Sequence, residues 1–127
     1  MSSQRVMITC LLLLVTSVTD VMAKSICDVE FVSPVQTEKV LVDDKKLIAD
    51  RSDGQYVAYF DEKASVAWAF TTELNSSHPS VICRKIVIEN GAYHIKMDVR
   101  CEGAKQSCDK LVANFDERNK RTIESLK

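Results

Sequence analysis

The sequence is poor in the residues that interrupt regular structure, and neither sign of charge is in surplus. Three glycines and two prolines occur in 127 residues, and no repeat or low-complexity stretch is present, which excludes an intrinsically disordered chain. There are 17 basic and 18 acidic side chains and no basic run. The chain therefore lacks the clustered cations with which proteins neutralise nucleic-acid phosphates. We expect one small folded domain and no nucleic-acid partner.

Motifs for catalysis and metal binding are also missing from the sequence. No GxSxG nucleophile elbow occurs, and the two histidines, His78 and His94, form no HxH or HExxH pattern. No two cysteines have the CxxC spacing that is typical of zinc sites. Asp98 follows His94 by four residues on one expected strand, a distance of about 13 Å. The sequence therefore predicts no catalytic residue, no metal site and no cofactor, with an enzyme that uses His94 and a serine such as Ser80 as a minor alternative.

One apolar run stands out near the N-terminus, at residues 6–15, directly after a segment with a single positive charge. The run has about half of the roughly 20 residues that span a bilayer. Val21 and Ala23 carry side chains that signal peptidase accepts before its cleavage site. We therefore predict a signal peptide over residues 1–23 and one mature domain over residues 24–127. The mature domain is expected to be periplasmic or secreted, with no membrane span after cleavage.

Cleavage after Ala23 would remove Cys10 and leave an even number of cysteines: Cys27, Cys83, Cys101 and Cys108. An exported chain meets an oxidising compartment, and four thiols in a domain of this size are typical of a disulfide framework. The sequence therefore predicts two disulfides.

A β-hairpin is the clearest structural prediction. Residues 80–90 and 93–101 alternate in polarity and flank Asn90-Gly91, a pair that favours a type I′ turn. The implied register places Ile88 opposite Tyr93 and Lys85 opposite Lys96, the latter an unfavourable pair unless an acid lies beside it. One face is expected to carry Ile82, Ile86, Ile88, Tyr93, Ile95, Met97, Val99 and Cys101. The other is expected to be polar, with Lys85, Glu89, Lys96, Asp98 and Arg100.

After Gly103 the apolar period changes to steps of three and four, which predicts a helix from about residue 104 to the end. Its inner stripe is expected to be Cys108, Leu111, Val112, Phe115, Ile123 and Leu126. Cys101 and Cys108 would then both face the core and form one bridge, leaving Cys27 to pair with Cys83. Because Cys83 alternates onto the polar face of the hairpin, the pairing Cys27–Cys101 with Cys83–Cys108 stays open.

The first half of the domain gives weaker patterns. Residues 26–32 alternate as a strand, and residues 50–54 have the composition of a turn. Residues 38–49 fit either one helical face or a short strand followed by a turn at Asp43-Asp44. Residues 56–60 and 64–74 read as two strands, although a helix capped by Asp61 competes for the second.

Together these elements predict an α+β fold. An antiparallel sheet of four or five strands would carry the C-terminal helix on one face, with two disulfides. The core between sheet and helix is expected to contain Trp68, Phe70, Phe31, the hairpin isoleucines and Phe115.

A small, exported, disulfide-bonded domain without catalytic groups is expected to bind a partner. In broad character the chain is similar to small periplasmic immunity proteins and lysozyme inhibitors, a likeness of class that no motif carries. We predict an inhibitor or immunity protein that blocks a secreted or periplasmic hydrolase, one that degrades cell walls. Expected contact residues lie on the polar hairpin face and in two loops: Lys85, His94, Lys96, Asp98, Asp50, Arg51, Asp53, Ser77 and His78.

Other functions stay open at this point. A small-ligand carrier would need an apolar pocket of a few hundred Å³ near Trp68, Tyr56 and Tyr59. A structural or cell-surface role is a further alternative, and pairing of sheet edges would permit a homodimer. Asn75-Ser76-Ser77 matches the N-glycosylation pattern, which matters only in a eukaryotic source.

Overall fold

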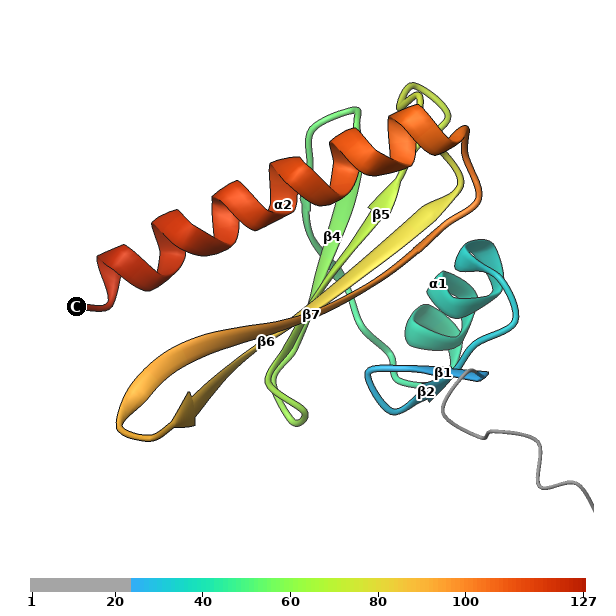
Figure 1. The fold of residues 1–127 in the computed structure, drawn as a ribbon. Coiled ribbons are helices and arrows are strands. Elements are labelled where there is room, and N and C mark those ends of the chain that lie inside the picture. The colour runs from blue at the N-terminus through green and yellow to red at the C-terminus, as the bar shows by residue number, and fades with distance from the viewer. Residues whose placement is uncertain (1–23) are drawn as a thin grey trace, which may run out of the picture.

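A computed structural model describes residues 24–127, so the predicted signal peptide, with Cys10, lies outside the described residues (Figure 1). The described residues form an α+β fold, as predicted. The elements in chain order are β1 (Ser25–Ile26), β2 (Val29–Glu30), α1 (Pro34–Asp43), β3 (Ala49–Ser52), β4 (Tyr56–Asp61), β5 (Val66–Thr71), β6 (Ser80–Glu89), β7 (Ala92–Cys101) and α2 (Lys105–Ser125).

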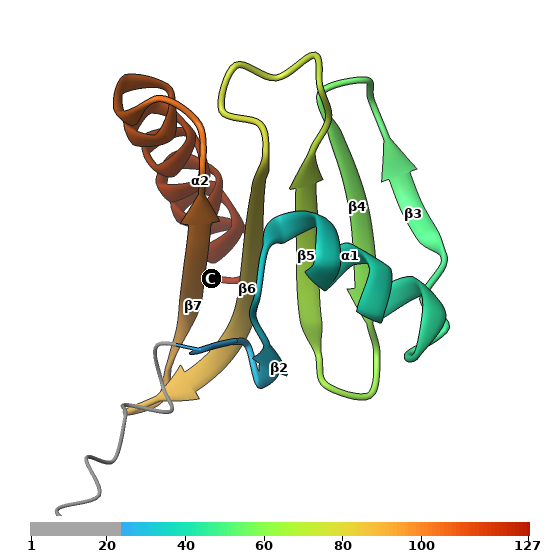
Figure 2. The same ribbon diagram turned by 90° about the vertical axis from the view of Figure 1, so that its right-hand side faces the viewer.

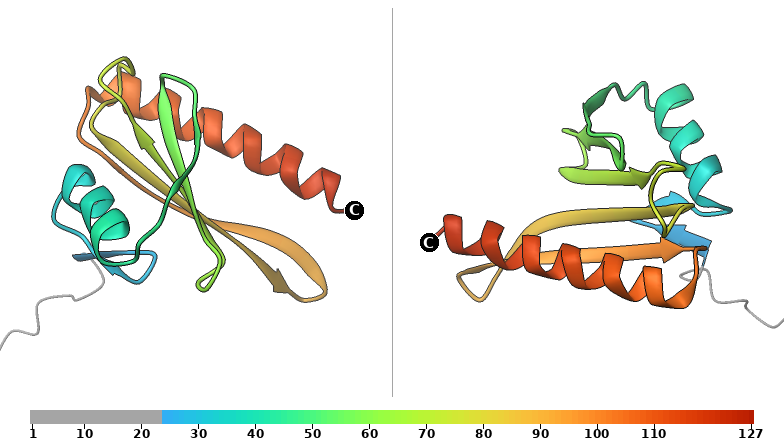
Figure 3. Two further views of the ribbon diagram at one scale, coloured as in Figure 1. Left: turned by 180° about the vertical axis from the view of Figure 1, so that it is seen from behind. Right: turned by 90° about the horizontal axis from the view of Figure 1, so that it is seen from above.

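Strands β3 to β7 form one antiparallel meander in which each strand pairs with the next along the chain. Figure 2 shows the five strands side by side, with α1 in front of the sheet and α2 behind it. Seen from above in Figure 3, the two helices lie on opposite sides of the sheet. The small β1–β2 hairpin lies on the side of α1. The sheet is thus covered on both faces, one by the N-terminal segment and one by the C-terminal helix.

The expectation of a single core between the sheet and the C-terminal helix is wrong. Strand register pairs Trp68 with Tyr59 on one side and with Cys83 on the other, so these three residues share a face. That face belongs to α1 and the β1–β2 hairpin, and its buried cluster also contains residues from both: Ile26, Val29 and Leu41. Trp68 and Phe70 therefore pack away from α2, because the N-terminal segment supplies a second layer that the alternation pattern alone does not reveal.

The core beneath α2 is smaller than predicted. Leu111 and Phe115 are buried against Ile82, with Tyr56, Ala69, Met97, Val99 and Cys101 around them. Two members of the predicted helix stripe, Val112 and Leu126, remain exposed. Of the β6 isoleucines only Ile82 is buried, because β5 pairs with β6 no further than Arg84.

The predicted hairpin and its register are confirmed, with Ile88 opposite Tyr93 and Lys85 opposite Lys96. Asn90 and Gly91 both have positive φ, 52° and 76°, as a type I′ turn requires. The preferred disulfides, Cys27–Cys83 and Cys101–Cys108, are also confirmed. Cys83 does lie on the face opposite α2, but there the N-terminal segment covers the sheet and brings Cys27 to it.

Two predictions for the first half, those for residues 26–32 and 38–49, need correction. Residues 26–32 are not one strand, because Cys27 and Asp28 both adopt positive φ and turn the chain between β1 and β2. The ambiguous segment is helical over residues 38–43 only, and α1 begins earlier, with Pro34 in its first turn. The Ser33 side chain caps it by accepting a hydrogen bond from the Gln36 N–H at 3.1 Å. The helix ends at Asp43, so residues 44–48 form the link to β3.

The predicted turn at residues 50–54 is wrong over its first half. Arg51 and Ser52 pair with Ala58 and Val57, so this segment is an edge strand, and the turn begins only at Asp53. Its polar composition fits an edge that faces solvent, where charged side chains discourage further pairing. The strand prediction for residues 64–74 is confirmed over β5, and the competing helix is excluded. The residues of β5 alternate between two covered faces, as a central strand requires.

Candidate functional site

Residues 85–96 form a two-stranded ribbon that we call the hairpin tip. Pairing between β5 and β6 stops at Ala67 and Arg84, whereas pairing between β6 and β7 continues to Glu89 and Ala92. The tip therefore extends past the sheet, and Figure 1 shows it projecting beyond the other strands. No element among residues 24–84 adds a strand to it.

The apolar face of the hairpin tip is on the same side of the sheet as α2. Ile86, Ile88 and Tyr93 are 46%, 68% and 43% exposed, and Ile95 lies among them partly buried. Cross-strand pairing places Ile88 beside Tyr93 and Ile86 beside Ile95. Four large apolar side chains thus share one surface of the tip, and three of them are exposed. Sequence alternation identified these residues but assigned them to the core.

The polar face of the tip carries three of the predicted contact residues together: Lys85, His94 and Lys96, all exposed. The unfavourable pairing of Lys85 with Lys96 is relieved by an acid, because the Lys96 ammonium lies 3.0 Å from the carboxylate of Glu89. The hydrogen bond and charge of Lys96 hold the pKa of Glu89 below its usual value. The tip thus has one apolar face and one mixed-charge face.

Asp98, the fourth residue predicted for that surface, lies further down the hairpin and is half-buried. Its carboxylate is paired with Arg100. Arg100 also donates to the carbonyl oxygen of Ser25 at 3.0 Å and stacks over the ring of Phe31 at 5.5 Å. Asp98 and Arg100 thus join β7 to the N-terminal segment. They lie apart from the hairpin tip.

Ser77 and His78 belong to a loop that is held tightly against the sheet. Ser77 is 1% exposed, and its hydroxyl donates to the Asn75 side chain at 2.6 Å. The Nδ1 atom of His78 lies 2.8 Å from the carbonyl oxygen of Thr71, which can only accept, so Nδ1 carries the proton. Ser80 donates its N–H to the Thr71 hydroxyl at 2.8 Å. These polar groups are occupied in a buried network that fixes the loop.

Asp50, Arg51 and Asp53 are exposed along β3 and the turn after it. They line a hollow of about 270 Å³ on the α2 side of the sheet. The hollow also touches Tyr56, Tyr59 and Trp68, the three residues around which a ligand pocket was predicted, although the rings of Tyr59 and Trp68 belong to the core on the opposite face. Two arginines complete its lining, Arg84 from β6 and Arg118 from α2.

The two arginines are functional candidates that sequence reasoning missed. Arg84 sits at an α2-facing position of β6 between Ile82 and Ile86, where it interrupts an apolar alternation. Arg118 follows Phe115 by three residues and so lies beside it on the helix surface. The interrupted alternation at Arg84 was the available signal, whereas Arg118 is indistinguishable in sequence from the other charges of α2.

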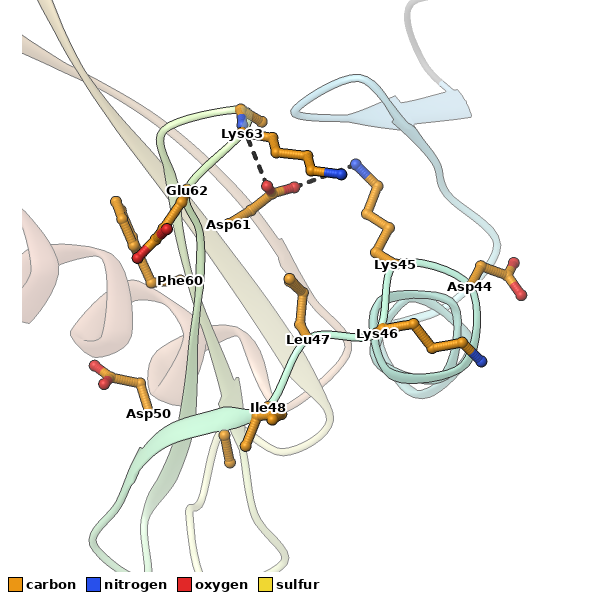
Figure 4. Close-up of a pocket in the computed structure, with 12 residues that line it drawn as sticks. Asp44, Lys45, Lys46, Leu47, Ile48, Asp50, Phe60, Asp61, Glu62 and Lys63 are labelled. Atoms are coloured by element: carbon orange, nitrogen blue, oxygen red, sulfur yellow. Dashed lines mark hydrogen bonds and ion pairs between the residues drawn. The ribbon is translucent and has the colours of Figure 1, made fainter.

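A wider hollow of about 1150 Å³ lies between residues 44–50 and the β4–β5 turn (Figure 4). Asp61 and Lys45 point toward one another across it, with 3.3 Å between carboxylate and ammonium. Burial alone would raise the pKa of Asp61, but hydrogen bonds from the Ala64 N–H and Lys45, together with the Lys45 charge, lower it below its usual value. Asp61 is therefore ionised at neutral pH, and its carboxylate is already bound by Lys45 and Ala64. This is typical of a residue that stabilises the fold.

A second tie joins α1 to the sheet. The hydroxyl of Tyr59 donates to a carboxylate oxygen of Glu38 at 3.1 Å. Burial, followed by the charge and the hydrogen bond of Glu38, raises the pKa of Tyr59 to about 12. The phenol is therefore protonated at neutral pH and serves as a hydrogen-bond donor.

Within residues 24–127, no group of three or more histidine, cysteine or acidic side chains is placed to hold a metal ion. No helix of this part of the chain has the length and apolarity needed to cross a membrane. The predicted contact residues thus occupy four separate places: the hairpin tip, the base of β7, the buried loop and the β3 edge. The tip combines three exposed predicted residues on one face with three exposed large apolar side chains on the other.

No family model matches the chain, and comparison with curated proteins and with solved structures also finds no match.

Proposed function

We propose that this protein is an exported, non-enzymatic binding module. It would act as an inhibitor or immunity protein that blocks a cell-wall-degrading hydrolase in the periplasm or the extracellular space. The observation that carries the proposal is the hairpin tip, where Ile86, Ile88 and Tyr93 are exposed on one face of a projecting ribbon. Apolar residues gathered on a projecting element are typical of the buried centre of a protein interface.

The support of the tip favours a rigid binding element. Cys83 on β6 is bonded to Cys27 of the N-terminal segment, and Cys101 on β7 is bonded to Cys108 of α2. Each strand of the hairpin is therefore fixed below the tip to a different neighbour. A ribbon held in its binding conformation loses little conformational entropy when it docks. The same two disulfides are consistent with an oxidising compartment.

The charged residues of the tip would contribute to selectivity for the partner. Lys85, His94 and Lys96 lie with Glu89 on the face opposite the apolar one. In a complex that buries the apolar face, these groups would form a polar rim, which affects association rate and selectivity more than affinity. The surface is mixed in charge, with cations in excess, so we expect carboxylates on the partner at this rim.

The proposal is tested with the oxidised protein, recovered after expression of the full chain in an exporting host. It is added to a panel of purified cell-wall hydrolases, namely a muramidase, an amidase and an endopeptidase. The clearing of cell-wall suspensions is then followed. We expect stoichiometric inhibition of one class. Ile88→Asp places a charge at the centre of the apolar face and should weaken inhibition at least tenfold.

The matched control is Ile48→Asp, which alters an apolar side chain that is 86% exposed and distant from the tip. It should leave inhibition unchanged. If no class in the panel is inhibited, or if both variants inhibit as well as the wild type, the proposed role of the tip is wrong.

A small-ligand carrier is the second candidate, and one observation favours it. The hollow on the α2 side of the sheet touches the three residues around which the pocket was expected, Tyr56, Tyr59 and Trp68. Its volume, about 270 Å³, is at the lower limit for ligand sites. The hollow is therefore better suited to a small molecule than to a lipid or a large metabolite.

A further inference from the structure

The hollow between β3 and α2 has apolar walls, two cations at its α2 end, and Arg51 with two acids at its β3 end. Its floor consists of three alanines on β4 and β5, Ala58, Ala67 and Ala69. Their small side chains leave space above the sheet. Aromatic rings stand around this floor, those of Tyr56, Phe60 and Phe115. Tyr56 and Phe115 meet edge to face, with 5.7 Å between ring centroids. The floor and walls would accommodate the apolar body of a small molecule.

The cations at the α2 end are Arg84 and Arg118, and both lie over the same ring. Their guanidinium carbons are 5.1 Å and 5.0 Å from the centroid of Phe115, and Arg118 also lies 5.5 Å from that of Tyr56. Arg84 donates to the side-chain oxygen of Asn119 at 3.2 Å. Neither arginine takes part in an ion pair within residues 24–127. Two cations thus share one aromatic platform without an internal counter-ion.

The two guanidinium charges repel one another in the free protein. Burial lowers the pKa of Arg84, and the charge of Arg118 lowers it further. Guanidinium groups remain protonated in proteins, so the repulsion is not relieved by loss of a proton. A bound anion would relieve it, and the planar guanidinium matches a carboxylate through two parallel hydrogen bonds.

The acids of the hollow lie at its β3 end together with Arg51, so that end has a net charge of −1 and favours a ligand with one negative charge. Asp50 and Asp53 come from β3 and the turn after it, whereas Arg84 comes from β6, three strands away. Asp53 is fixed there, because its carboxylate accepts the N–H groups of Gln55 and Tyr56 at 3.0 and 2.9 Å. A ligand with a second negative charge would be repelled by these carboxylates.

We propose that this hollow binds a small monocarboxylate with an aromatic or branched apolar body. The carboxylate pairs with Arg84 and Arg118, and the body lies on the alanine floor against Tyr56, Phe60 and Phe115. The proposal deepens the carrier candidate by naming its ligand class. It does not involve the hairpin tip, so it can be tested independently of the proposed inhibition of a hydrolase.

The test is calorimetric titration of the oxidised protein with 3-phenylpropionate at pH 7.5. We expect a Kd below about 1 mM, as for a ligand of this size with one charged contact. The neutral analogue 3-phenylpropanamide keeps the apolar body and should bind at least tenfold more weakly. Phenyl phosphate, a dianion at this pH, should also bind at least tenfold more weakly because of Asp50 and Asp53.

Variants locate the site. Arg118→Gln changes an exposed side chain and should weaken binding of 3-phenylpropionate at least tenfold, and Arg84→Gln should do the same. Arg121→Gln removes another exposed cation of α2, one outside the hollow, and should leave the Kd unchanged. Circular dichroism establishes that each variant is folded, and Arg118→Gln remains informative if Arg84→Gln unfolds.

Three results would overturn the proposal. They are absence of binding at millimolar 3-phenylpropionate, equal binding of the amide, and unchanged affinity in a folded Arg118→Gln variant. Tighter binding of phenyl phosphate than of 3-phenylpropionate would contradict the preference for one charge. None of these results bears on inhibition of a hydrolase by the Ile88→Asp variant and its control.

Discussion

Gly103 lies directly against the backbone of Ser77. A Cβ placed on Gly103 would be 2.7 Å from the carbonyl oxygen of Ser77 and 2.8 Å from its Cα. Two further contacts join the same segments, because the Glu102 N–H donates to the carbonyl oxygen of Pro79 at 2.9 Å and Cys101 Sγ lies 3.4 Å from that of Ser77. The link between β7 and α2 is thus packed tightly against the loop before β6.

Gly103→Ala should therefore destabilise the domain. The neighbouring atoms belong to backbone, which cannot rotate away as a side chain can, so we expect a loss of about 1–3 kcal/mol in the free energy of unfolding. Urea denaturation measures this loss. Glu102→Ala alters the exposed neighbouring side chain and should change stability by no more than about 0.5 kcal/mol. Equal stability of Gly103→Ala and the wild type would contradict the close packing.

Gly103 illustrates what sequence patterns can and cannot predict. In the sequence this glycine only marks the end of a strand. The hairpin, by contrast, was predicted with its register, because Asn90-Gly91 and the alternation around it are local signals. The final helix was predicted for the same reason. Close approach between Gly103 and Ser77 depends on how distant segments pack, which no local pattern records.

The second layer of the fold was missed for a related reason. Cys83 alternates onto a face that carries Lys85 and Lys96 toward the turn, so the whole face was interpreted as solvated. The lower part of that face is covered by α1 and the β1–β2 hairpin, and there Val81 and Cys83 are fully buried. Alternation identifies which residues share a face but not which part of the face another segment covers. The candidate site at the tip was recognised on its charged side and missed on its apolar side for the same reason.

The N-terminus of α2 offers a stabilising substitution. Its N-cap residue is Ala104, with extended backbone angles and no side-chain hydrogen bond, whereas α1 is capped by the Ser33 hydroxyl. Ala104→Ser should satisfy one free N–H of the first turn and raise the free energy of unfolding by about 1 kcal/mol. Thermal unfolding should then shift upward by about 4–8 °C. Ser33→Ala provides the reciprocal control, with a loss of similar size, and an unchanged or lower melting temperature for Ala104→Ser would contradict the prediction.

The two disulfides should contribute unequally to stability. Cys27 and Cys83 are 56 residues apart in sequence, whereas Cys101 and Cys108 are separated by 7. In the chain-entropy model the longer loop contributes about 4 kcal/mol and the shorter about 2.5 kcal/mol. Replacing Cys27 and Cys83 together by serine should therefore lower the urea midpoint more than replacing Cys101 and Cys108. The reverse order would show that anchoring of α2 matters more than attachment of the N-terminal segment.

Asp61 should make the stability of the domain dependent on pH in the acid range. The carboxylate is almost fully buried, and it accepts hydrogen bonds from Ala64 and Lys45. Because its folded-state pKa is below the unfolded value of about 3.9, its contribution is complete above that pH and is lost as the pH falls through the folded pKa. Asp61→Asn keeps an acceptor for Ala64 but removes the charge facing Lys45, so we expect a loss of about 1 kcal/mol at pH 7. Unfolding curves at pH 7 and pH 2.5 should show this difference between wild type and variant at the higher pH and a smaller difference at the lower pH. Glu62→Gln changes an exposed acid one residue away and should show no such pH-dependent difference. If the difference in unfolding free energy between Asp61→Asn and wild type were the same at both pH values, the charge of Asp61 would not act through Lys45.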